Sequence, residues 1–153
     1  MQGFVQLEKL LNRFHLVARQ LTQRQRKKKP FVITDEYDVQ DLLHALLKIE
    51  FDNVKLEEPT PSLAGKPAYM DILLPTLGIV IETKMTRKGL TEKGVGDELL
   101  IDIARYQEHE GCRTLVCFVY DPGQWVKNPM GLKSDLEKKS TERLAVVVIV
   151  CQH

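Results

Sequence analysis

Two continuous apolar runs near the end of this 153-residue chain constrain its fold most strongly. Residues 114–120 and 144–150 are rich in β-branched and aliphatic side chains and lack the alternation of a half-exposed strand. Strands of this kind are covered on both faces, as in parallel sheets flanked by helices. Helices are expected over residues 97–109 and 128–139, before and between the two runs. The sequence therefore predicts a single α/β domain in which a parallel strand is added through the helix at 97–109.

Two amphipathic helices are expected before any strand. Apolar residues at three- and four-residue spacing predict one over residues 4–25, which runs into a basic segment and stops at Pro30. Thr34 or Asp35 can cap the second helix, which ends at Asp52-Asn53.

A β-hairpin is predicted in the middle of the chain. Four segments follow in order: a short strand at 54–57, a loop at 59–67 and two β-rich runs at 69–74 and 79–85. The two β-rich runs are joined by Pro75-Thr76-Leu77-Gly78. If Pro75 and Gly78 lie opposite each other, Asp71 faces Glu82 across the two strands.

The opposed acids form a candidate metal site. Directly opposed side chains lie on one face with Cβ atoms about 5 Å apart, so Asp71 and Glu82 could share one divalent cation. Lys84 falls on the same face, which we expect to present a site while the other face is buried. Opposed like charges cost stability unless something compensates, and a bound cation would do so. The alternative is that Glu82 and Lys84 are ordinary polar residues of an edge strand, because Glu-x-Lys triplets are common.

A further acid is expected from the second helix. Glu36 lies about 55° from the centre of its apolar face on a helical wheel, closer than Asp38 or Asp41. A favourable position on the helix dipole is its other possible role, and both roles can hold. Gln40 and His44 follow at four-residue steps and could line the same cleft, although a half-buried polar role is expected for His44.

The charge distribution is uneven although the formal net charge is only +1. Residues 1–30 carry a net charge of +7 and residues 31–60 one of −6. A basic arm beside an acidic segment is one pattern expected of a protein that holds a polyanion and binds a metal, and a solvated helix end is the alternative. The basic run is a candidate for grasping a nucleic-acid duplex and comprises Arg24, Arg26, Lys27, Lys28 and Lys29.

These features together resemble the PD-(D/E)XK nuclease superfamily and, more closely, the catalytic domain of DpnII/MboI-type restriction endonucleases. The resemblance covers about residues 34 to 137, and its segments are 35–47, 79–84, 86–90, 102–106, 115–122, Asn128-Pro129 and Gly131-Leu132. The sequence departs from the superfamily motif before Asp71, where Met70 stands in place of proline.

The resemblance implies an α/β fold with a PD-(D/E)XK core: a small mixed β-sheet flanked by helices, with an extra N-terminal helix. On this interpretation residues 1–30 form that helix with its basic end, and residues 31–153 form the nuclease domain. It implies a restriction- or defence-type endonuclease that hydrolyses DNA with Mg²⁺, for which Mn²⁺ could substitute. Asp71 and Glu82 would be metal ligands, Lys84 would orient or activate the attacking water, and Glu36 would complete the acidic site.

Other basic residues are candidates for contacts with nucleic-acid phosphates. Arg87 and Lys88 follow the Glu-x-Lys strand, and Arg105 lies beside Asp102 in the sequence of the third helix. The alternatives are a solvated loop and an ion pair between Arg105 and Asp102.

DNA is the expected partner, and a double-strand cutter of this size is expected to act as a homodimer. A separate targeting domain or partner protein is also possible, because the chain is short for an enzyme that both reads and cuts. The alternative functions are a catalytically silent nucleic-acid-binding module, RNA as substrate, and an interaction domain with a structural cation.

We expect a cytoplasmic protein without a membrane partner. The longest apolar run is too short to cross a bilayer, and the N-terminus lacks a signal-peptide pattern. The three cysteines lack metal-ligand spacing and are expected to be reduced core residues.

Overall fold

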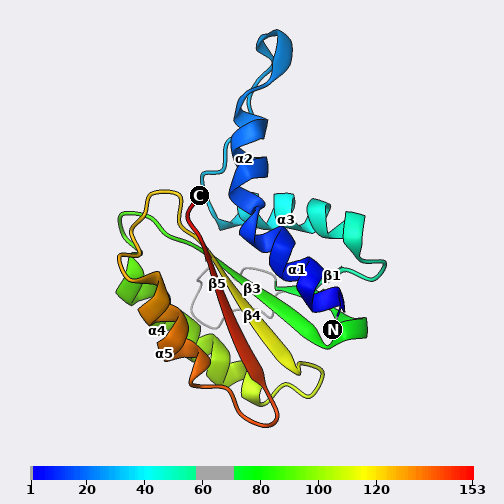
Figure 1. Cartoon of the computed structure of the whole chain (residues 1–153), viewed down its shortest axis with the longest axis vertical. Helices are drawn as coiled ribbons and strands as arrows, with labels where there is room; N and C mark the ends of the chain where they lie inside the picture. The colour runs from blue at the N-terminus through cyan, green and yellow to red at the C-terminus, as the bar shows by residue number, and fades with distance from the viewer. Residues whose placement is uncertain (1, 58–70) are drawn as a thin grey trace.

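A five-stranded mixed sheet forms the centre of the computed structural model, which describes residues 2–57 and 71–153 (Figure 1). The strand order follows the chain: β1 (Lys55–Leu56), β2 (Ile72–Leu74), β3 (Ile79–Met85), β4 (Thr114–Tyr120) and β5 (Ala145–Cys151). The first three strands pair antiparallel, whereas β4 and β5 are added in parallel. The α/β prediction and the parallel addition of β4 are therefore confirmed, and β5 extends the parallel part.

The predicted hairpin and its register are confirmed. Leu74 pairs with Ile79 and Ile72 with Ile81, so the register continued by one residue places Asp71 opposite Glu82. The turn is a 3₁₀ turn over Pro75–Leu77, closed by Gly78 in the left-handed conformation at φ +65°. The expected loop at 59–67 and the first two residues of the run at 69–74 lie outside the described residues.

The prediction of a single N-terminal helix over residues 4–25 is wrong. The chain forms α1 (Gln2–Asn12) and α2 (Phe14–Thr22), separated at Arg13, whose ψ of 2° is not helical. The break lies next to Phe14, which is fully buried and packs edge-on against aromatic rings of β4, with ring centroids 5.3 and 5.0 Å away. Because apolar spacing continues across the break, the pattern does not reveal it.

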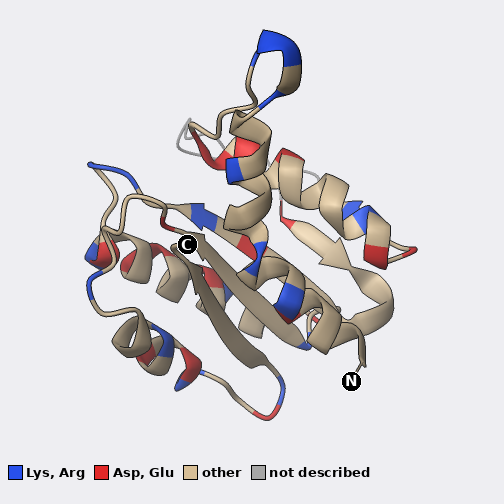
Figure 2. Ribbon diagram, turned by 45° about the horizontal axis from the view of Figure 1, so that its top comes forward, with Lys and Arg blue, Asp and Glu red and all other residues tan. Residues whose placement is uncertain are grey.

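The basic run after α2 forms a projecting loop, not a helix end (Figure 2). It includes the short 3₁₀ turn η1 (Gln25–Lys27), in which Arg26 and Lys27 both have positive φ. The Leu21 carbonyl accepts a hydrogen bond from the Phe31 amide at 3.1 Å, which closes the base of the loop. We call residues 24–29 the basic loop.

The other helices agree with the sequence patterns to within a few residues. α3 (Glu36–Glu50) is capped by Asp35, whose side chain accepts a hydrogen bond from the Asp38 amide, and α5 (Pro129–Glu137) lies within the expected range. α4 (Glu92–Gln107) begins five residues earlier than expected. Gly94 and Gly96 suggested a loop there, but a Cβ on Gly94 would lie 2.9 Å from the Leu90 side chain.

Helices cover both faces of the sheet and create two hydrophobic cores. α1, α2 and α3 pack on one face, where Leu11, Phe14 and Leu43 are buried against Ile81 and Phe118. The helices α4 and α5 pack on the other face (Figure 1). Among the described residues, no helix combines the length and apolar character needed to span a membrane.

Candidate active site

The acid pair and Lys84 lie together on the sheet face that α4 covers. Asp71 and Glu82 are 4% exposed and Lys84 is 7% exposed. Both faces of the hairpin are therefore buried, because α4 lies across this face and contributes charged side chains of its own. Among the described residues, Glu98, Asp102 and Arg105 on this helix make ion pairs with the motif residues and so shape their electrostatic environment.

Asp71 is held through both its backbone and its side chain. Its carbonyl accepts a hydrogen bond from the Glu57 amide at 2.8 Å, one residue beyond β1. Its carboxylate accepts a hydrogen bond from the Tyr106 hydroxyl, which also lies 2.9 Å from Glu57 Oε2. Burial and the nearby Asp71 raise the pKa of Tyr106, so its hydroxyl stays protonated and remains a donor.

Lys84 lies among three carboxylates. Its Nζ is 3.1 Å from Asp102 Oδ2, 3.5 Å from Glu82 Oε1 and 3.7 Å from Glu98 Oε1. Burial acts to lower the pKa of Lys84, but Glu82, Asp102 and Glu98 outweigh it, and the pKa is raised above its ordinary value. The side chain is therefore an ammonium that can donate hydrogen bonds and stabilise negative charge, and it cannot accept a proton from water.

Arg105 bridges the two opposed acids from α4. Its Nη2 lies 3.2 Å from Asp71 Oδ2 and 3.3 Å from Glu82 Oε2, and 3.7 Å from Asp102 Oδ1. The ion pair with Asp102, considered as an alternative to a phosphate contact, is thus present together with two stronger contacts. Burial and the neighbouring Asp71 raise the pKa of Glu82 well above its usual range, because both disfavour its charged form.

Glu36 turns inward, as its place on the helical wheel predicted. It is buried at the start of α3, whereas Asp38 is half-buried and Asp41 is exposed. Its Oε1 accepts a hydrogen bond from the Met85 amide at 3.2 Å, which places it at the end of β3. Burial raises the pKa of Glu36, while the Met85 amide and Lys84 oppose that rise. Gln40 is buried and His44 half-buried on the same helix.

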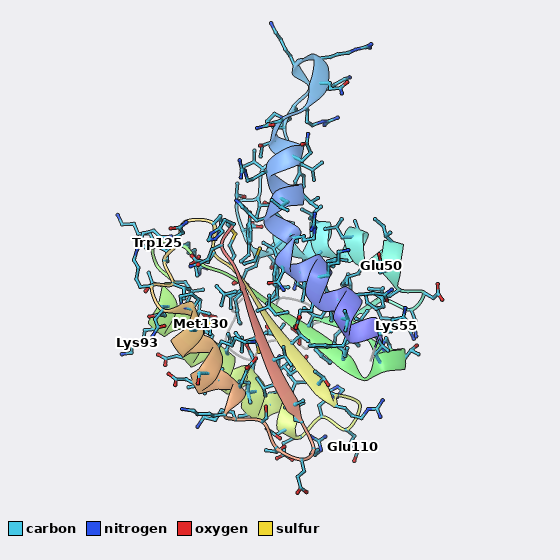
Figure 3. All side chains as sticks on the ribbon, in the orientation of Figure 1. Glu50, Lys55, Lys93, Glu110, Trp125 and Met130 are labelled. Carbon is cyan, nitrogen blue, oxygen red and sulfur yellow. The ribbon has the colours of Figure 1, made fainter. Side chains whose placement is uncertain are left out.

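The remaining candidates lie outside this cluster. Arg87 and Lys88 are exposed in the connection between β3 and α4, where the Arg87 and Leu90 backbones exchange hydrogen bonds. The basic loop projects beyond α2, at a distance from α4 (Figures 1 and 2), and its long side chains extend away from the sheet (Figure 3). The structure therefore brings together Asp71, Glu82, Lys84 and Arg105, with Glu36 beside Lys84, and leaves the basic loop apart.

The sequence patterns did not identify four polar residues that contact the site: Glu57, Glu98, Asp102 and Tyr106. Three of them lie on α4 at four-residue steps, which puts them on one helix face. That spacing was a usable signal, although Tyr106 was expected to face inward only as a core residue. Glu57 carried no signal, because it follows a strand of two residues.

The donor chemistry of the acid pair fits a hard divalent cation. Asp71 and Glu82 offer carboxylate oxygens, the ligands that Mg²⁺ prefers. Both already contact one positive nitrogen, Nη2 of Arg105, so their oxygens converge on a single centre. Within residues 2–57 and 71–153, however, no three acidic, histidine or cysteine side chains are grouped as metal ligands. A divalent cation shared by Asp71 Oδ2 and Glu82 Oε2 would take the position that the Arg105 guanidinium occupies.

Comparison with known proteins gives one match. The family model described as REase_DpnII-MboI matches residues 5–153, which is nearly the whole chain. No curated protein and no solved structure gives a significant match. The matched range includes most of α1, the basic loop and every residue of the candidate site.

Proposed function

The chain belongs to the DpnII-MboI family of restriction endonucleases, and on that premise we propose that it hydrolyses phosphodiester bonds in DNA with Mg²⁺ at the site formed by Asp71, Glu82 and Lys84. The observation that carries the proposal is the convergence of the two buried carboxylates on one cation, with Lys84 beside them. Mn²⁺ is expected to substitute, because it accepts the same oxygen ligands. The restriction-type role follows from the family, whereas the metal requirement is part of the proposal.

Asp71 and Glu82 would hold the metal, and Glu36 would complete the acidic set from the end of β3. The chemistry that a divalent cation supplies at such a site is charge neutralisation at the phosphate and a water that ionises near neutral pH. Tyr106 on α4 holds the Asp71 carboxylate in place through its hydroxyl. Contacts within the protein thus hold Asp71 in place before any substrate is present.

Lys84 would orient the attacking water and stabilise the negative charge that develops on the phosphate. Its place on β3 fixes the backbone, and Asp102 at 3.1 Å fixes the ammonium. Because the side chain stays protonated, its contribution is that of a donor and a positive charge. Lys84 is therefore not the base that removes the proton from the attacking water.

The DNA backbone would be contacted by the exposed cations around the site and by the basic loop. Arg87 and Lys88 lie between β3 and α4, and the basic loop carries five cations in six residues. Contacts between cations and phosphates position a duplex without reading its sequence, and they weaken steeply with salt. Site recognition would then come from other parts of the surface, a partner subunit or a separate targeting protein.

A plasmid-nicking assay tests the proposal. We expect cleavage of supercoiled DNA with Mg²⁺, none with EDTA, and loss of cleavage in Asp71→Asn and Lys84→Ala. Lys84→Ala is expected to fold and still bind metal, which circular dichroism and a metal titration check. Cleavage at the wild-type rate by Lys84→Ala would contradict the assignment. DNA binding without any cleavage would instead favour the silent binding module, and preferential cleavage of RNA would change the substrate class.

A homodimer is proposed for double-strand cleavage, because one site of this kind cuts one strand. The cytoplasm is the proposed location. Analytical ultracentrifugation with and without DNA tests the dimer, and a monomer under both conditions would remove it.

A further inference from the structure

We infer that Arg105 is a resident counter-cation of the acid pair, which holds the metal position between Asp71 and Glu82 until a divalent cation displaces it. This inference rests on the proposed function, because it assigns a competitor to the proposed metal site. It makes Arg105 a determinant of metal affinity. The sequence had suggested a phosphate contact or a simple ion pair with Asp102 for this residue.

The geometry of one nitrogen carries the inference. Nη2 of Arg105 is 3.2 Å from Asp71 and 3.3 Å from Glu82, and its contact with Asp102 is longer, at 3.7 Å. The two shorter contacts are to the two residues proposed as metal ligands. One positive atom thus takes an oxygen from each ligand, and a metal ion at the same position would overlap it.

Exposure shows which of the two site cations can leave. The Arg105 side chain is 57% exposed, whereas the side chains of Asp71 and Glu82 are 5% exposed. Arg105 therefore lies between the solvent and the buried acids and can rotate outward without unfolding the core. Lys84, with a side chain 9% exposed, has no such freedom.

The acids keep their supports when Arg105 leaves. Tyr106 donates its hydroxyl to Asp71, and Glu57 holds the Asp71 backbone, so neither contact depends on the guanidinium. The Arg105 guanidinium carbon also lies 4.8 Å from the centre of the Tyr106 ring, which is a cation–π contact. Displacement would therefore empty one position within a site whose other members stay in place.

Competition between the two cations sets the expected effect. A divalent ion must replace the Arg105 contacts and then tolerate a positive charge nearby, and both conditions lower its affinity. Because Arg105 is partly exposed, solvent screens the effect. We expect removal of this charge to tighten metal binding on the order of tenfold, which corresponds to about 1.4 kcal/mol.

Calorimetric titration with MnCl₂ and no nucleic acid tests the inference. Arg105→Gln is compared with wild type at low ionic strength and at the same pH of about 8, which is well above the ordinary pKa of a carboxyl group. Lys48→Gln on α3 is the matched control, since it removes one exposed cation from the opposite face of the sheet. The expected result is a Kd about tenfold lower for Arg105→Gln and unchanged for Lys48→Gln. Equal or weaker Mn²⁺ binding by Arg105→Gln would overturn the inference.

The double variant Arg105→Gln/Glu82→Gln locates the binding. It is expected to lose the gain, and retention of tight Mn²⁺ binding would place the ion elsewhere and also overturn the inference. A second measurement needs no folded variant: the side-chain ¹⁵N signals of arginine in the wild-type protein are expected to include one that shifts on addition of Mg²⁺. If Arg105→Gln shows the gain but no variant cleaves DNA, the proposed function fails while the inference holds.

Discussion

The ammonium of Lys84 and the carboxylate of Asp102 lie 3.1 Å apart, although one is on the central strand β3 and the other on the covering helix α4. This pair links the motif strand to the helix across the site. Burial raises the pKa of Asp102, while Lys84 and Arg105 oppose that rise. Asp102 thus depends on the two site cations as much as they depend on it, and its removal should misplace Lys84 without removing its charge.

Asp102→Asn is expected to lower the cleavage rate about ten- to a hundredfold, the usual cost of losing a residue that orients a functional side chain. Initial rates of plasmid nicking measure the effect. Glu98→Gln is the matched control on the same helix, because Glu98 is 46% exposed and lies farther from Lys84. A larger loss in Glu98→Gln than in Asp102→Asn would contradict the role given to Asp102.

Tyr106→Phe is expected to destabilise the protein by about 1–3 kcal/mol. The substitution removes the hydroxyl that lies against the carboxylates of Asp71 and Glu57, and Asp71 stays buried without that hydrogen bond. Urea denaturation followed by circular dichroism measures the change. Cleavage should also decrease, since Asp71 loses the contact that holds it when Arg105 moves. If Tyr106→Phe is as stable as wild type, the hydroxyl does not support Asp71.

His15 is expected to make a contribution to stability that is lost as the pH drops below about 6.5. Its Nδ1 lies 2.6 Å from the Tyr120 hydroxyl, so an unprotonated Nδ1 of neutral His15 can accept a hydrogen bond from the phenol. Burial, with the nearby charges of Arg19 and His153, lowers the pKa of His15 in the folded state. The unfolded chain therefore binds the proton more readily, and acid shifts the equilibrium toward unfolding until the pH is below the folded-state pKa.

Urea unfolding of His15→Gln at about pH 7.5 and about pH 5.5 checks this contribution. The variant keeps an acceptor for Tyr120 but does not titrate, so acid should destabilise it less than it destabilises wild type. His44→Gln, which removes a half-buried histidine from α3, is the control. An undiminished pH dependence in His15→Gln would show that other groups cause it.

Neutralising the basic loop should weaken DNA binding and its dependence on salt. In Lys27→Gln/Lys28→Gln/Lys29→Gln, each lost phosphate contact is expected to reduce the slope of log K against log salt by about 0.9. Fluorescence anisotropy with a labelled duplex, over a series of salt concentrations, measures the slope. A triple variant at Lys48, Lys138 and Lys139 removes the same charge from exposed positions elsewhere and should change the slope less.

The hairpin was predictable because its turn and its alternation agree. Pro75 and Gly78 define the turn, and a strand period of two residues then determines which acid faces Glu82. The position of Glu36 followed from its angle on the helix for the same local reason. These features depend on residues that are close together in the sequence, so the spacing of residue types is enough to predict them.

Contacts between distant elements were not predictable in the same way. Arg105 joins the acids only because α4 crosses the face of β3, and no local pattern gives the position of that helix. The break at Arg13 likewise depends on where Phe14 packs against β4, since the apolar spacing itself is continuous. The early start of α4 was not predicted because glycine disfavours a helix interior. In the structure Gly94 lies close to the Leu90 side chain, where a Cβ would be 2.9 Å from it.

The sheet keeps the two hydrophobic cores apart, and this separation affects how such a protein can change over evolution. Side chains of α1 and α2 pack on one face, while the acid pair, Lys84 and Arg105 lie on the other. Substitutions among the N-terminal helices can therefore drift, or adapt to a new partner, with little effect on the chemistry. Along α4 the same freedom is absent, since one helix both seals a core and supplies Asp102, Arg105 and Tyr106.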